Sequence, residues 1–167
     1  MSKGLEIRCY DYVNHPYAKV RDTLQQGALD VFQAATKAAA SRAQSVAAEL
    51  HVDLAGIGVK ADIRISVKNI EEKLGDEQSG PATRLGLEWE ATTAPSLFPL
   101  MKAELSVYPL TSTETQLDFC GHYEPPFGPL GRAVNAVAGH RVAEASVHRF
   151  IREVSEYLRQ SLAATRR

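Results

Sequence analysis

The chain lacks most of the features that identify common functional classes. Its two cysteines, Cys9 and Cys120, have no metal-site spacing and provide no disulfide framework. Its net charge of −1 gives no long-range attraction to nucleic acid or to an acidic membrane. No segment approaches the roughly 18 apolar residues of a membrane span, and the first ten residues contain no apolar run of signal-peptide length. We therefore expect a cytoplasmic protein without nucleic-acid partners or stable membrane insertion.

Motifs for nucleotide binding and hydrolysis are absent from the sequence as well. The glycine-rich run at 128–135 has neither phosphate-loop nor dinucleotide-binding spacing, and there is no GxSxG or HExxH motif. His140, Glu144 and His148 follow one another at helical (i, i+4) spacing, but a metal needs a further convergent ligand, so we interpret them as ordinary edge and surface charges. Asp11 is either a buried acid or base or, the favoured alternative, an exposed carboxylate at a strand end. We predict no metal and no cofactor.

Length and composition suit one domain that spans residues 1–167 and has a sizeable core, since 44% of the residues are hydrophobic. Residues 5–13 alternate between apolar and polar and predict a half-buried strand. The sequence Asn14-His15-Pro16 is typical of a helix start. A helical segment then extends to about Leu50, with Gly27 or the residues near Thr36 able to divide it into two helices.

From His51 onward the hydrophobic period changes to two. Four alternating segments follow, at 57–68, 84–91, 101–107 and 116–123, and turns are expected at 75–83, near Pro95 and at 110–113. Such alternation is typical of antiparallel strands with one wet face and one covered face. The sequence therefore predicts an α+β fold with a sheet of six or seven strands.

A long helix, from about Leu130 to Leu162, closes the chain. Ala136, Ala143, Phe150 and Tyr157 recur every seven residues and predict its buried face. The buried face is small in its first half, around Ala136 and Gly139, and large in its second half. We expect this helix to cover the apolar face of the sheet and to leave room beneath its first half.

In this order of elements the chain resembles the START and polyketide-cyclase-like (SRPBCC) superfamily. The residues most similar to that superfamily are LFPLMKAELSVYPL at 97–110 and GHYEPPFGPLGRAVNAVAGHRVAEASVHRFI at 121–151. The resemblance implies a helix-grip fold of β-α-α-β(5-6)-α order, in which a curved antiparallel sheet wraps around the C-terminal helix. It also implies an elongated apolar cavity between the two. No catalytic motif of the superfamily matches residue by residue.

The predicted ligand-binding residues project from the covered face of the sheet or from the small half of the helix. They are Ile65, Leu87, Trp89, Met101, Leu105, Phe119, Tyr123, Asn135, Ala136, Gly139 and Val142. For Phe119 and Leu105, packing within the core is an equally good interpretation. At Tyr123 and Asn135 the pocket is favoured, because both carry hydrogen-bonding groups beside the stiff Pro/Gly corner.

The expected function is binding of an apolar small molecule, lipid- or polyketide-like, as a carrier or sensor. The alternative is a cyclase, aromatase or dehydratase acting in the same cavity, where one or two polar groups would move a proton. Because the inward strand positions are nearly all apolar, binding is the favoured interpretation. The third interpretation is a filled core without a cavity, in which the outer face of the sheet would bind another protein.

Overall fold

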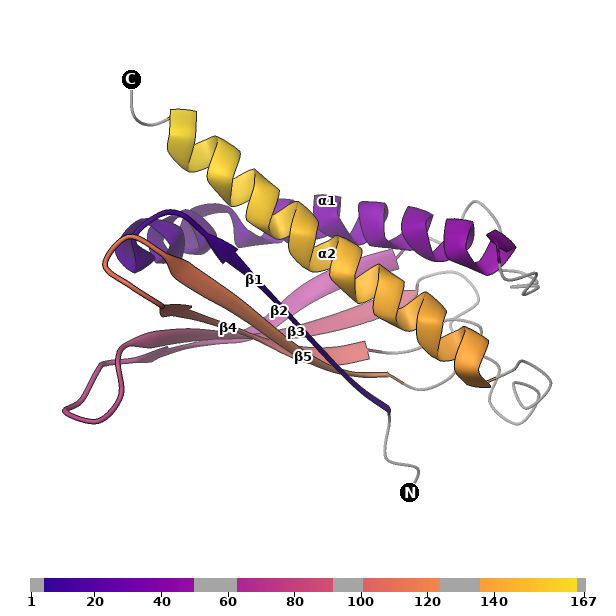
Figure 1. Ribbon diagram of the computed structural model, residues 1–167, viewed down its shortest axis with the longest axis horizontal. Coiled ribbons are helices and arrows are strands. Elements are labelled where there is room, and N and C mark those ends of the chain that lie inside the picture. Colours follow the sequence, from indigo (N-terminus) through magenta and orange to yellow (C-terminus); the bar gives the residue numbers. More distant parts are fainter. Residues whose placement is uncertain (1–4, 50–62, 92–100, 124–135, 165–167) are drawn as a thin grey trace.

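A computed structural model of the chain describes residues 5–49, 63–91, 101–123 and 136–164, apart from a few side chains near the ends of these segments. In chain order the elements are β1 (Leu5–Val13), α1 (Tyr17–Glu49), β2 (Ile63–Lys73), β3 (Ala82–Ala91), β4 (Met101–Pro109), β5 (Thr115–Tyr123) and α2 (Ala136–Ala164). The five strands form one antiparallel sheet in the order β1-β5-β4-β3-β2. Both helices lie on the same, concave face of this curved sheet (Figure 1).

The described residues contain the predicted strand at 5–13, parts or all of the four alternating segments, and the turns at 75–83 and 110–113. Inward positions such as Leu85, Leu105 and Leu117 are almost completely buried, as the two-residue period predicted. Of the strand predicted at 57–68, residues 57–62 lie outside the described residues, and the described part continues to Lys73. A bulge between Val67 and Asn69 reverses the alternation within it. The described residues form five strands where six or seven were predicted, and the turn expected near Pro95 lies outside them.

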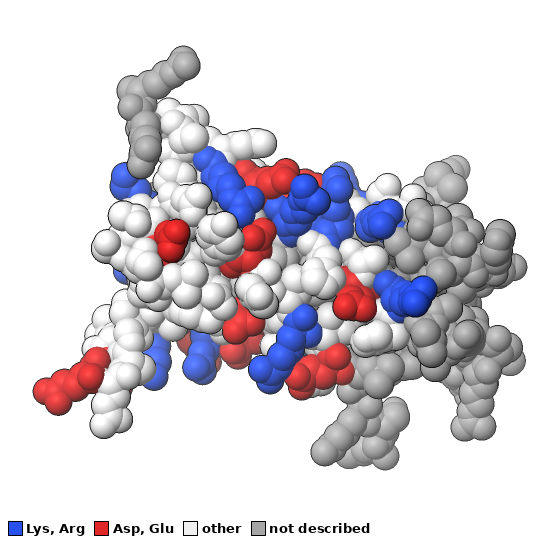
Figure 2. Space-filling model, in the orientation of Figure 1, with Lys and Arg blue, Asp and Glu red and all other residues white. Residues whose placement is uncertain are grey.

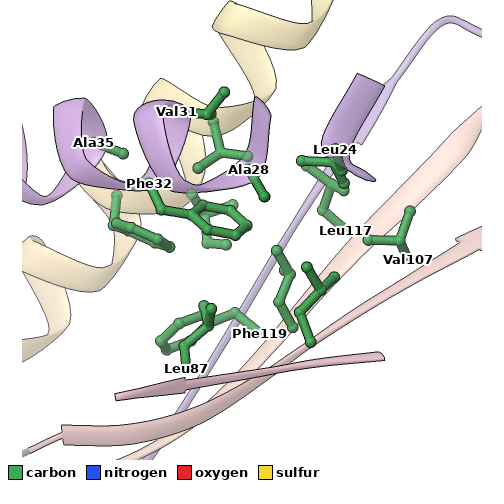
Figure 3. Close-up of a cluster of buried hydrophobic side chains, with 14 of the residues drawn as sticks. Leu24, Ala28, Val31, Phe32, Ala35, Leu87, Val107, Leu117 and Phe119 are labelled. Atoms are coloured by element: carbon green, nitrogen blue, oxygen red, sulfur yellow. The ribbon is translucent and has the colours of Figure 1, made fainter. Parts of the chain in front are cut away.

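Helix α1 begins directly after Pro16 and is kinked at Gly27, one of the two positions predicted to divide it. Gly27 has φ −147° and ψ 24°, which is not helical. The segment after the kink places Ala28, Val31 and Phe32 against the sheet and against α2. Figure 3 shows Phe32 pointing from α1 toward the sheet, from which Leu87 and Phe119 point back. The sequence predicted that the last helix covers the apolar face of the sheet. In the structure, α1 and α2 cover it together.

Helix α2 has one buried and one exposed face. Phe150, Val154 and Leu158 are buried, whereas ion pairs such as Arg149–Glu153 lie on the outside. The prediction that Tyr157 belongs to the buried face is wrong, because its side chain is 44% exposed. A seven-residue repeat drifts by about 20° per heptad on a straight helix, so Leu158 occupies the inner position two turns after Phe150.

The outer surface of α2 carries both signs of charge. In the view of Figure 2, Lys and Arg side chains alternate with Asp and Glu side chains over this helix. No helix in the described part of the chain is long and apolar enough to cross a membrane.

Candidate ligand-binding site

The strand register gives the concave face a row of small side chains. Ile7 lies opposite Gly121, Gly121 opposite Ala103, and Ala103 opposite Leu87. Directly opposed residues on neighbouring strands point to the same side of a sheet. Ala103 and Gly121 therefore form a shallow floor at the centre of the sheet, between the larger side chains of Ile7 and Leu87. We call these four residues the small row.

Larger side chains lie on both sides of the small row. On the side of the β4–β5 turn, Leu105 pairs with Phe119 and both are completely buried. On the other side, Ile65 pairs with Trp89, and these side chains are 2% and 7% exposed. Ala103 itself is only partly buried, although β4 is the central strand of the sheet. Ala103 is therefore the one member of the small row that is not buried, since Ile7, Gly121 and Leu87 are.

An aromatic cluster borders the small row. The ring of Phe150 on α2 lies 5.1 Å from Trp89, edge to face, and 5.9 Å from both Phe119 and Phe32. The indole Nε1–H of Trp89 donates a hydrogen bond of 2.9 Å to Thr36 Oγ1, which in turn donates to the Phe32 carbonyl at 2.7 Å. Trp89 is therefore fixed in both position and orientation by the second half of α1. The pattern of the sequence did not reveal Thr36 as its partner.

The predicted site residues divide into two groups. The structure brings Ile65, Leu87, Trp89, Leu105 and Phe119 together in the core beside the small row. For Met101, Tyr123, Ala136, Gly139 and Val142 it gives the backbone position only, and Asn135 lies outside the described residues. Met101 and Tyr123 pair with each other at the end of the sheet beyond the small row. The sequence missed Ala103 and Gly121, since their proximity depends on the register between strands.

Buried polar side chains on the concave side have partners. Tyr17 OH and Thr83 Oγ1 lie 2.7 Å apart and join α1 to β3. Thr115 Oγ1 donates to the His15 carbonyl at 2.7 Å. Among the described residues, no buried side-chain nitrogen or oxygen atom lacks a hydrogen-bond partner. Such saturated groups hold the helices on the sheet.

A thiol and an imidazole meet where α2 crosses β1. Cys9 Sγ lies 3.2 Å from His148 Nδ1, and His148 Nε2 lies 3.8 Å from Glu144 Oε1. Burial raises the pKa of the Cys9 thiol to about 11, with smaller contributions from the carboxylates of Asp11, Asp118 and Glu144. The two predicted surface charges, Glu144 and His148, are indeed exposed and paired with each other.

Within the described segments, no group of three or more His, Cys, Asp or Glu side chains could hold a metal ion.

Asp11 was expected to be either a buried acid or base or an exposed carboxylate at a strand end, and the structure shows a partly buried carboxylate in an ion pair. Its side chain is 25% exposed and pairs with Arg159 of α2 at 3.3 Å, and the same guanidinium donates to the Tyr12 carbonyl at 2.6 Å. The carboxylate therefore joins β1 to the second half of α2. Arg159 is itself partly buried at this contact.

Comparison with known proteins gives matches at the level of structure. No protein-family profile and no curated protein matches the sequence. The aromatase/cyclase Zhui from Streptomyces sp. R1128 has a similar structure, with a TM-score of 0.51, 11% identity and 95% of both chains covered. A hypothetical protein from Helicobacter pylori has a TM-score of 0.48 and 11% identity, covering 94% of this chain and 89% of that one. A conserved protein from Geobacillus kaustophilus also has a TM-score of 0.48, with 12% identity over 94% and 97% of the two chains.

Identities this low show the fold alone. The β-α-β₄-α order, the curved antiparallel sheet and the long last helix agree with the helix-grip fold of the aromatase/cyclase. The chain therefore has the fold of the START and polyketide-cyclase-like superfamily, as the sequence resemblance predicted.

Proposed function

We propose that this protein binds an apolar small molecule between the sheet and helix α2, above the small row, as a carrier or sensor. The observation that carries the proposal is the partial exposure of Ala103 on the central strand of the concave face, although Ile7, Leu87, Leu105 and Phe119 around it are buried. Ligand sites are typically concave and mainly apolar, with few polar groups. The cytoplasmic location expected from the sequence is part of this proposal.

The surroundings of the small row favour a hydrophobic ligand. Ile7, Leu87, Trp89 and Phe119 would contact it from the sheet, and Ala143 lies on the buried face of α2. No charged side chain is among them. We include Met101, Tyr123, Asn135, Ala136, Gly139 and Val142 in the site on the sequence argument, because the ends of β4 and β5 and the first turns of α2 extend it.

A cyclase or dehydratase is the second candidate, and the fold shared with an aromatase/cyclase is the observation in its favour. Proton transfer needs a polar group within hydrogen-bonding reach of the substrate. The buried hydroxyl groups of Tyr17, Thr36 and Thr83 each already bind a protein partner. Binding without reaction is therefore the preferred proposal.

Titration with N-phenyl-1-naphthylamine, an uncharged apolar fluorophore, tests the proposal. The wild type should bind it and transfer energy from Trp89, the only tryptophan. Ala103→Phe should abolish binding and lower the free energy of unfolding by less than about 1 kcal/mol, because the ring would occupy open space. Ser106→Phe adds the same ring on the opposite face of the same strand and should leave binding intact.

A filled core gives the opposite results. The wild type would then not bind the fluorophore, and Ala103→Phe would overpack the core at a cost of about 1–3 kcal/mol. The corresponding substitution on the helix, Ala136→Phe, extends the test to the sequence-derived half of the site. Mass spectrometry of the native protein would identify a ligand that co-purifies with it.

A further inference from the structure

The contact between Cys9, His148 and Glu144 brings together a nucleophile, a base and a carboxylate. The thiol faces Nδ1 of the imidazole at 3.2 Å, and the carboxylate faces Nε2 from the other side at 3.8 Å. In this order one ring nitrogen can accept the thiol proton while the carboxylate stabilises the resulting imidazolium. The three side chains extend from the interior to the solvent, because Cys9 is only 6% exposed whereas His148 and Glu144 are largely exposed.

The thiol belongs to the same face of the sheet as the small row. Cys9 pairs with Phe119, and Ile7 and Gly121 form the next inward pair along the same two strands. Neighbouring inward positions on a strand are about 7 Å apart. A molecule lying above Gly121 and Ile7 would therefore bring its edge within reach of the Cys9 sulfur.

We propose that Cys9, with His148 as its base, forms a covalent bond with electrophilic ligands of the apolar site, in particular with conjugated ketones. This proposal rests on the proposed function. A thiol sulfur is a soft nucleophile, and conjugate addition needs a base but no group that stabilises a tetrahedral intermediate. The oxyanion donors of acyl transfer are therefore not required.

The addition balances without any further reactant. Cys9 Sγ forms a bond with the β-carbon of the ketone, and the π electrons of the C=C bond move into an enolate. The thiol proton passes to His148 Nδ1 and from there to the α-carbon, which restores the ketone. The reverse steps release the ligand, so capture is reversible.

The charges around Cys9 explain why it needs a base. Asp11 on β1, Asp118 on β5 and Glu144 on α2 all oppose a negative sulfur, and burial opposes it more strongly, so that the pKa is about 11. At neutral pH the group is a thiol. Attack by the sulfur requires loss of its proton, and His148 is the neighbour whose ring nitrogen contacts the sulfur.

The test is labelling with 4-phenylbut-3-en-2-one, an apolar conjugated ketone, followed by mass spectrometry and peptide mapping. The adduct should form on Cys9. His148→Gln keeps a polar side chain of similar size on an exposed position and should slow Cys9 labelling at least about 10-fold. Cys120, which is half-buried on the convex face, is the internal control and should react equally in both proteins.

Two further measurements separate this proposal from the one on which it rests. Binding of N-phenyl-1-naphthylamine should be unchanged in His148→Gln, and Ala103→Phe should slow labelling of Cys9 by the apolar ketone more than labelling by acrylamide, a small polar electrophile. If the fluorophore binds but Cys9 stays unlabelled, or reacts as fast in His148→Gln as in the wild type, the covalent proposal is overturned alone. Absence of fluorophore binding by the wild type overturns the proposed function itself.

Discussion

The two halves of the sheet are built differently. Toward the β4–β5 turn, Val13, Val107, Leu117, Val154 and Leu158 are completely buried, and side chains from both helices and the sheet fill the space. At the small row, Ala103 and Gly121 replace such residues and Ala103 is partly exposed. Burial of branched side chains stabilises the fold, whereas small residues contribute little. We expect from this difference that the first half contributes most of the stability, and the proposed ligand site lies over the second.

Leu117→Ala should have the largest effect, because it leaves a void in the filled half. We expect the free energy of unfolding to fall by about 2–5 kcal/mol, measured by urea denaturation. Leu110→Ala is the matched control, since Leu110 is 47% exposed in the turn before β5, and it should change stability by no more than about 0.5 kcal/mol. Equal effects at the two leucines would contradict the packing described for this half.

Cys9 lies at the boundary between the halves and gives stability a pH dependence. Its folded pKa of about 11 exceeds its ordinary value of 9.0, mainly because of burial. The unfolded chain therefore ionises first, so the stabilising contribution is complete below pH 9 and is lost as the pH rises toward 11. The difference in unfolding free energy between wild type and Cys9→Ala should shrink by at most about 3 kcal/mol over this range.

Urea denaturation at pH 8, 9, 10 and 10.5 would measure this loss. The same difference taken with Cys120→Ala should change less, because Cys120 is only partly buried on the convex face. A difference for Cys9→Ala that stays constant with pH would mean that water reaches the thiol.

Thr36→Val tests how the aromatic cluster is held beside the small row. Valine keeps the shape of threonine but leaves the buried Trp89 Nε1–H without its acceptor, which should cost about 1–3 kcal/mol. Thr23→Val is the control, because Thr23 also donates to the carbonyl four residues earlier in α1 but accepts no bond from the sheet. It should cost less than about 0.5 kcal/mol. A shift of Trp89 fluorescence in Thr36→Val alone would show that the indole has moved.

Sequence patterns predicted the features of this fold that depend on local order. The two-residue alternation predicted which strand positions are buried, Pro16 marked the start of α1, and Gly27 was one of two positions predicted for its kink. They did not predict contacts between distant residues, such as the bond between Thr36 and Trp89. The small row was missed for the same reason, since Ala103 and Gly121 become neighbours only when the β4–β5 register is fixed.

Arg159→Gln should have the smallest effect of the series and concerns the filled half again. Arg159 binds both Asp11 and the Tyr12 carbonyl, so it fixes α2 to the outermost strand and occupies a backbone acceptor of β1. Because the pair is partly exposed and therefore screened by solvent, we expect a loss of only about 1 kcal/mol in urea denaturation. Arg149→Gln removes a purely helical ion pair with Glu153 at 2.7 Å and should cost less than about 0.5 kcal/mol. Fluorophore binding should be the same in both variants, because neither contacts the small row. If Arg159→Gln weakened binding, the two halves would be coupled through α2 and the division between a stabilising and a binding half would be wrong.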